Sequence, residues 1–267
     1  MSFLEICFLD PLFIFEQENE LVTPHVKEKI SERYTSCLKL DGRTFLKVAN
    51  NNLDLREEFT LTCWLKLDTH KTHTILDRYD RESMKGILVQ VVPVRNGIGV
   101  LTLFVNEKRL RGKHPIRMNE NSQLSFFGVS FKSRAKDGVR FYAEGLLEDS
   151  HSCFEPVGNT EHALSTMVGR QRENEENHLV GTIDNLSLWS RALSDVEVSS
   201  IMFSVLGGKE PGLELFYDFD DKTDFFADAT MKRHDGVVKG TREIVYCKDK
   251  TFKISPCKKN KIQRIQP

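Results

Sequence analysis

The most informative segment of this chain is Gly181-Thr-Ile-Asp-Asn-Leu-Ser-Leu-Trp-Ser-Arg-Ala-Leu-Ser-Asp-Val-Glu-Val-Ser-Ser-Ile201. Its first half is rich in apolar and aromatic residues, which predicts a strand ending near Trp189. Ser194 is then a good N-cap residue, and Glu197, three positions later, completes a capping-box pattern. Apolar residues follow at helical spacing until two consecutive glycines provide a stop signal. The segment therefore predicts a strand that leads directly into a short helix over residues 194–206.

Outward from this segment, the chain predicts a series of short strands. The run Phe59–Leu67 alternates most clearly, with its odd-numbered residues facing one way. Turn signals separate several runs, at Asp41-Gly42, Asn96-Gly97 and Asp137-Gly138. Further strands are expected at Thr74–Tyr79, Gly86–Val94, Ile98–Val105, Leu124–Phe131, Val139–Ala143, Ala163–Val168 and Leu213–Phe219. Near the end, Ile244–Tyr246 is expected to pair with Val237-Val238. This pattern predicts an all-β fold, a two-sheet antiparallel sandwich with one short helix.

Length and charge narrow the function classes. The chain has 267 residues and a formal net charge of −1. A single β-domain can occupy that length and bury a substantial core. The balanced charge argues against nucleic acid as the main partner, because phosphate binding usually needs a basic excess.

The amino-terminal segment, residues 1–33, begins with an apolar run that is similar to a secretory h-region. Glu5 and Asp10 interrupt this run, no basic n-region precedes it and no small-residue cleavage site follows. The run is also too short and too charged to span a membrane. We therefore divide the chain into residues 1–33, a poor signal peptide or linker, a β-domain over residues 34–246, and a basic, Cys-containing tail over residues 247–267.

Six blocks occur in an order that characterises one family. They are Leu38–Val48, Phe59–Leu67, Thr74–Asp77, Val139–Leu147, Met167–Gly169 and Gly181–Ile201. Together they resemble the laminin-G-like, concanavalin A-like jelly-roll domain found in pentraxins and many secreted modular proteins. The resemblance spans roughly residues 34–220 and implies a jelly roll with an extracellular, lectin-like binding function.

A narrower resemblance concerns the end of the β-domain. Gly212–Asp220, Asp235-Gly236 and the Cys pair that follows are similar to the end of the amino-terminal laminin-G-like module of pappalysins, which are large secreted zinc proteases. This resemblance implies an alternative function, that of a structural domain in a larger secreted metalloprotease.

Calcium is the metal that the family resemblance implies, bound through carboxylates and backbone carbonyls. Asp184, at the position of the family's strand acid, is then the first candidate ligand. Asp41 and Asp218 join it if the first and last strands are neighbours. The structural alternative is that Asp41 only makes a turn and that Asp184 caps backbone groups.

Catalytic patterns are missing from the sequence. Glycosidases that share the fold use two carboxylates about 5–5.5 Å apart at alternating strand positions, and no strand here reads Glu-x-Asp-x-x-Glu. The acidic loop with Glu173, Glu175 and Glu176 lies in an expected turn instead. His-Glu-x-x-His, the zinc-protease motif, is also absent. We therefore expect no enzymatic activity, with a glycoside hydrolase of the same fold as the weaker alternative.

Two basic runs are candidate glycan-binding sites. The first contains Lys108, Arg109, Arg111 and Lys113, and continues to His114 and Arg117. The second lies in the tail and contains Lys258, Lys259, Lys261 and Arg264. Either run can attract sulfated glycans by charge. The structural alternative is a solvated loop and an unstructured tail.

The six cysteines permit up to three disulfides. A local bridge between Cys247 and Cys257 is the preferred pairing, because the tail has little core of its own, and it implies an oxidising compartment. The alternative is that both are free surface thiols. Cys63 lies within an apolar strand and is expected to be a buried, unbridged side chain.

Taken together, these features predict a non-catalytic extracellular binding or adhesion module. The expected partner is a glycan or an extracellular protein, with no nucleic acid and no membrane span. The ligand is expected on loops at residues 68–73, 95–97, 106–123 and 170–178.

Overall fold

The structure, a computed structural model, describes residues 34–49, 52–153, 155–159, 165–172, 177–220, 225–230 and 232–248. The amino-terminal segment, the acidic loop at 173–176, Cys257 and the basic tail run therefore lie outside the described residues. No helix in the described ranges is long and apolar enough to cross a membrane.

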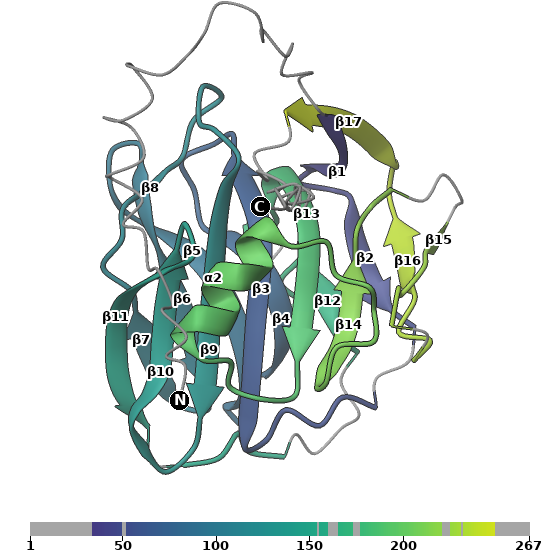
Figure 1. Ribbon diagram of the computed structural model, residues 1–267. Helices are drawn as coiled ribbons and strands as arrows, with labels where there is room; N and C mark the ends of the chain where they lie inside the picture. The colour runs from purple at the N-terminus through teal and green to yellow at the C-terminus, as the bar shows by residue number, and fades with distance from the viewer. Residues whose placement is uncertain are drawn as a thin grey trace, which may run out of the picture. The chain divides into compact units, whose positions relative to one another are not determined.

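Two antiparallel sheets form the fold, as the sequence predicts (Figure 1). The strands of the first sheet are β1 (Tyr34–Asp41), β3 (Glu58–Leu67), β9 (Ser125–Lys132), β10 (Ala135–Ala143), β11 (Leu146–Cys153), β13 (Val180–Trp189), β14 (Leu213–Tyr217) and β17 (Glu243–Lys248). Their order is β11-β10-β9-β3-β13-β1-β17, and β14 also pairs with β13.

The strands of the second sheet are β2 (Phe45–Val48), β4 (His73–Asp80), β5 (Lys85–Arg95), β6 (Ile98–Val105), β7 (Lys108–Arg111), β8 (Ile116–Arg117), β12 (Met167–Val168), β15 (Phe225–Phe226) and β16 (Gly236–Lys239). Their order is β15-β16-β2-β12-β4-β5-β6-β7, and β8 also pairs with β6. The chain passes from one sheet to the other between β1, β2, β3 and β4, which is how a jelly roll is wound.

The space between the sheets is filled by one apolar cluster. The alternation predicted for β3 is confirmed, because Phe59, Leu61, Cys63, Leu65 and Leu67 all belong to this cluster and are each 2 % exposed or less. Removing this much apolar surface from water is the main favourable term in folding.

Helix α2 (Asp195–Phe203) lies across the outer face of the first sheet, in front of β3 and β9 in Figure 1. The predicted capping box is confirmed: the Glu197 backbone N–H donates to Ser194 Oγ, and the Ser194 backbone N–H donates to the Glu197 carboxylate at 2.8 Å. Val198 and Met202 pack beneath the helix on an aromatic layer. That layer consists of Trp64, Phe126, Tyr142, Trp189 and Phe216.

The helix ends earlier than the sequence predicts. Its last residue is Phe203, and Ser204 is the C-cap in extended conformation. The hydroxyl of Ser204 donates to the Ser200 carbonyl at 2.7 Å and its backbone N–H donates to the Ile201 carbonyl at 3.2 Å. Because these bonds satisfy carbonyls of the last turn, the helix stops before the two glycines are reached.

Two predicted hairpin turns are wrong. Asp41-Gly42 does not join a hairpin, because β1 and β2 lie in different sheets. The hairpin between β9 and β10 turns at Ser133 and Arg134, where Arg134 has a φ of +54°, and not at Asp137-Gly138. Gly138 lies within β10, next to a register irregularity. A Cβ atom there would lie 2.3 Å from the Lys132 carbonyl oxygen, so the close approach of two backbones requires this glycine.

One predicted strand pairing is also wrong. Val237-Val238 pairs with β2 in the second sheet, whereas Ile244–Tyr246 pairs with β1 in the first. The chain crosses between the sheets near Thr44, whose hydroxyl bonds both backbone groups of Thr241, at 2.9 and 3.0 Å. As a consequence Cys247, which the sequence places in the tail, lies inside strand β17.

Candidate ligand-binding pocket

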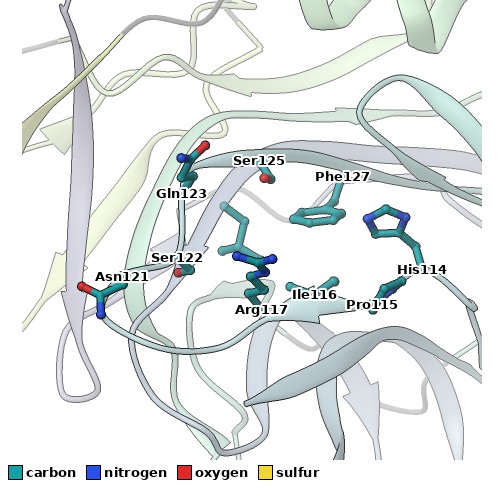
Figure 2. A pocket seen from close by; sticks show the side chains of 10 residues that line it. His114, Pro115, Ile116, Arg117, Asn121, Ser122, Gln123, Ser125 and Phe127 are labelled. Carbon is teal, nitrogen blue, oxygen red and sulfur yellow. The ribbon is translucent and has the colours of Figure 1, made fainter.

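A pocket of about 340 Å³ opens at one end of the sandwich. Its lining residues are Leu65, His114, Pro115, Ile116, Arg117, Asn121, Ser122, Gln123, Ser125 and Phe127. Figure 2 shows His114, Arg117 and Phe127 around the same space. The lining comes from β3, from β9 and from residues 112–124, which we call the pocket loop. Such a concave site with a few convergent polar groups is typical of small-ligand binding.

The pocket loop is held in place by buried anchors. Ile116 is 5 % exposed and pairs through β8 with Gly99 on β6. Met118 is 1 % exposed, and its backbone N–H donates to the Gly97 carbonyl at 2.9 Å. The Ser122 hydroxyl donates to the Leu67 carbonyl at 2.8 Å, which ties the far end of the loop to β3. The loop is therefore organised before any ligand arrives, which lowers the entropic cost of binding.

The floor of the pocket is apolar and its rim is polar. Leu65, Ile116 and Phe127 on the floor are all at most 5 % exposed as residues. Arg117 and Asn121 on the rim are exposed, and their side chains make no hydrogen bond or ion pair with any described part of the protein. A guanidinium group offers five N–H donors, and a side-chain amide offers both donors and an acceptor. These groups are thus free to bond a polar ligand that lies on the apolar floor.

His114 forms one wall of the pocket. Its ring centroid lies 6.2 Å from that of Phe127, in a tilted arrangement. On its other side, Nδ1 lies 3.6 Å from the Glu148 carboxylate. His114 therefore links the pocket to the acidic residues of β11.

The four basic residues that the sequence singles out lie on and after the edge strand β7, and Lys113 directly precedes His114 of the pocket. Two of the four charges are paired with carboxylates. Lys108 lies 3.6 Å from Glu155, and Lys113 lies 2.8 Å from Asp149. The guanidinium group of Arg109 lies over the ring of Phe104, at 5.3 Å from its centroid.

Arg111 is an exposed residue of β7, and its carbonyl is bonded to His151 Nε2 at 2.8 Å. The nearby Asp149 carboxylate is 6 % exposed and bonded to Lys113. Burial would raise the pKa of Asp149, but the hydrogen bond and charge of Lys113 and the charge of His151 outweigh it, so its pKa lies below its usual value. Lys108 and Lys113 are thus paired with carboxylates, whereas Arg109 and Arg111 have no ion pair among the described residues. Glycan binding by these four residues stays a prediction.

Of the three candidate calcium ligands, Asp41 lies apart from Asp184. Asp41 pairs with Val180, four positions before Asp184 on β13, which is a spacing of about 13 Å along a strand. Asp218 follows β14, and its carboxylate accepts from the Asp220 backbone N–H at 3.1 Å. Within the described ranges, no group of three or more His, Cys, Asp or Glu side chains is arranged to hold a metal ion.

Asp184 and Asp41 each bond local groups. Asp184 is 1 % exposed and accepts from the Asn185 backbone at 2.8 Å and from the Thr35 hydroxyl at 3.2 Å. Burial raises its pKa well above the usual range. Asp41 accepts from the backbone of Arg43 and Thr44 at 2.8 and 2.7 Å. These carboxyl groups do not fit a shared calcium site, and calcium binding stays a prediction.

Four of the six cysteines lie within the described residues. Cys63 is buried and unbridged, as the sequence predicts. Cys37 and Cys153 are also buried free thiols, and Cys247 is a partly exposed one. The predicted bridge from Cys247 to Cys257 ends outside the described residues and stays a prediction.

Seven of the ten lining residues lie within the expected ligand loop at 106–123, and two of them, His114 and Arg117, belong to the basic run. Ser125 and Phe127 were missed because they lie in a strand and look like ordinary core positions. Leu65 was missed for the same reason.

The fold and the pocket define a jelly-roll domain with a cavity between β3, β9 and the pocket loop. The chain belongs to the concanavalin A-like lectin/glucanases superfamily, whose laminin-G family model matches residues 40–199.

Two solved structures illustrate the similarity. A protein from Bacteroides ovatus with a proposed carbohydrate-binding role has a TM-score of 0.63 and 16% identity, over 81% of this chain and 60% of that one. The heptameric SAP-like pentraxin of Limulus polyphemus has a TM-score of 0.54 and 13% identity, over 81% of this chain and 96% of that one. At such low identities these similarities concern the fold.

One curated protein is similar in sequence over a shorter range. Sialidase B of Streptococcus pneumoniae is 32% identical over 111 residues, which make up 40% of this chain and 15% of sialidase B. The chain therefore matches only a small part of the length of that relative.

Proposed function

We propose that this chain is a non-catalytic binding module that holds a carbohydrate in the pocket between β3, β9 and the pocket loop. The observation that carries the proposal is the combination of an aromatic floor at Phe127 with the unbonded polar side chains of Arg117 and Asn121. A sugar ring has an apolar face and a border of hydroxyl groups, and this lining is complementary to both.

The size of the pocket supports a small ligand. Its volume of about 340 Å³ lies at the lower end of the roughly 300–1,000 Å³ that is typical of ligand sites. This space suits one sugar ring or the end of a short glycan. Membership of a superfamily named for lectins and glucanases is consistent with such a ligand, and the proposed extracellular location rests on the family resemblance alone.

The lining argues for binding without hydrolysis. None of the described residues that line the pocket is an aspartate or glutamate. Glycosidases of the usual kind need two carboxyl groups, about 5–5.5 Å apart for retention or about 6.5–9.5 Å for inversion. We therefore expect a bound glycan to be recovered intact after prolonged incubation, and release of new reducing ends would favour the hydrolase alternative.

The test is a glycan array probed with the purified chain, followed by calorimetric titration of the best ligand. Arg117→Ala and Asn121→Ala should each weaken binding by about tenfold or more, which is the effect of losing about 1.4 kcal/mol. Arg134→Ala is the matched control, because Arg134 is an exposed arginine in the turn at the opposite end of β9. Failure of the wild-type chain to bind any glycan would contradict the proposal, as would equal affinities for wild type and both pocket variants.

A further inference from the structure

We propose that Cys37 and Cys247 are joined by a disulfide when the protein is oxidised, and that this bond fastens the edge strand β17 to β1. The two residues lie near opposite ends of the described chain, but the register of the first sheet brings them together. Cys37 is paired with Val245, and Cys247 with Thr35. They are therefore diagonal neighbours on the same face of an antiparallel pair.

The two thiols lie close to each other. The Cys37 thiol donates to the Thr35 carbonyl at 3.8 Å, and Thr35 is the residue opposite Cys247 in the β1–β17 pair. Cys37 is fully buried, whereas Cys247 is partly exposed to solvent. A reagent in solution can therefore reach Cys247 more easily than Cys37.

No other described cysteine competes for this contact. Cys63 faces the interior of the sandwich from β3. Cys153 lies on β11, at the opposite edge of the first sheet from β17, and its thiol donates to the Glu155 carbonyl at 3.4 Å.

The charges around the pair favour a reactive thiolate at Cys247. The interaction with the neighbouring Cys37 thiol, together with the charges of Lys66 and Lys39, lowers the pKa of Cys247 to about 7. The same interaction, with burial and the nearby Asp184, raises the pKa of Cys37 above its usual range. Cys247 is therefore the attacking sulfur, since the thiolate is the nucleophile in disulfide exchange.

The oxidant is a small-molecule disulfide, for which oxidised glutathione is the probe. The Cys247 thiolate attacks one glutathione sulfur, forms a mixed disulfide and releases the first glutathione thiolate. Cys37 then loses its proton to that thiolate and attacks Cys247 Sγ, which releases the second glutathione. Two protein thiols are oxidised, and one glutathione disulfide is reduced to two thiols, so atoms and electrons balance.

The bond requires the sulfurs to approach to about 2.05 Å. Diagonal neighbours in an antiparallel pair have Cα atoms about 7–8 Å apart, beyond the roughly 4.4–6.8 Å that is usual for a disulfide, so the backbone must move. Strand β17 can move because it lies at the edge of the first sheet and, among the described strands, pairs only with β1. The bond would close a long loop of the unfolded chain, so it should stabilise the folded protein.

The direct test uses the full chain in glutathione buffers of increasing oxidised fraction. Free thiols are trapped with N-ethylmaleimide, and the non-reduced digest is analysed by mass spectrometry. We expect a crosslinked peptide that contains Cys37 and Cys247. A crosslink from Cys247 to Cys257, or complete alkylation of Cys37 and Cys247 in the most oxidising buffer, would overturn the proposal.

Thermal unfolding gives a second readout that does not depend on digestion. Oxidation should raise the midpoint of the wild-type chain by about 5–10 °C, and a reductant should reverse the rise. Cys37→Ser should remove this redox-dependent shift, whereas Cys63→Ala, a change at a buried cysteine outside the pair, should keep it. If Cys37→Ser retains the full shift, another pair of cysteines is responsible and the proposal fails.

Discussion

The outer face under helix α2 and the pocket loop differ in how their polar groups are used. Under α2, the Trp189 indole N–H donates to Ser187 Oγ at 2.9 Å, and the capping box satisfies the start of the helix. In the pocket loop, Arg117 and Asn121 have no bonding partner among the described residues. The polar groups named under α2 thus bond to one another, whereas the two side chains of the pocket loop have unused hydrogen-bonding capacity.

This difference indicates that the face under α2 serves mainly stability and that the rim of the pocket serves mainly ligand binding. A tightly packed region whose buried polar groups are all hydrogen-bonded contributes to folding. Those groups have no hydrogen-bonding capacity left for a ligand. The unbonded polar side chains at the rim of the pocket loop contribute little to stability but are available to a ligand. Changes under α2 should therefore affect unfolding, and changes at the rim of the pocket should affect binding.

The largest expected effect is at Trp189. This side chain is 2 % exposed and packs in the cluster beneath α2. Trp189→Ala should lower the free energy of unfolding by about 3–5 kcal/mol, because it removes a large buried ring and leaves a cavity. Chemical denaturation monitored by circular dichroism measures the change. A loss smaller than about 1 kcal/mol would contradict a structural role for this face.

The next effect concerns the support of the pocket loop. A Cβ at Gly99 would lie 2.4 Å from Met118 Sδ and 2.8 Å from Val91 Cγ1. Gly99→Ala should displace Met118, cost about 1–3 kcal/mol of stability and weaken glycan binding at the same time. Gly207→Ala is the matched control, because a Cβ there meets only Glu210 Oε1, at 3.7 Å. Unchanged glycan affinity in Gly99→Ala would show that the loop position does not matter for the ligand.

A smaller effect is expected at the helix cap. Ser194→Ala removes the side chain that accepts from the Glu197 backbone N–H. The free energy of unfolding should fall by about 1 kcal/mol, and glycan affinity should stay the same. A drop in affinity would mean that α2 and the pocket are coupled, which the comparison of the two regions does not allow.

Calcium is expected to have the smallest effect. Because Asp41 and Asp184 lie apart and both bond local groups, millimolar Ca²⁺ and EDTA should give unfolding midpoints within about 1 °C of each other. A clear rise with Ca²⁺ that is lost in Asp184→Ala would instead establish the calcium site that the family resemblance implies.

Local patterns made the core of the fold predictable. The alternation of Phe59–Leu67 and the Ser194–Glu197 capping box depend on neighbouring residues, so the sequence alone identifies them. The pairing of β17 with β1 depends on residues about 200 positions apart, and no local pattern encodes it. Gly138 was read as a turn because its other role, a close backbone approach, depends on the partner strand.

The pocket was only partly predictable for the same reason. The basic run and the expected ligand loop at 106–123 overlap part of the lining of the proposed pocket. The apolar floor could not be recognised, because Leu65 and Phe127 alternate within strands in the same way as core residues. Only the fold shows that these two positions lie at the open end of the sandwich.

The most direct test of the proposed binding site is hydrogen–deuterium exchange of the purified chain, with and without the tightest glycan found on the array. We expect slower exchange in peptides that cover residues 112–127 and unchanged exchange in peptides that cover residues 190–206. Protection confined to α2, or protection confined to β7 with none in the pocket loop, would contradict this expectation.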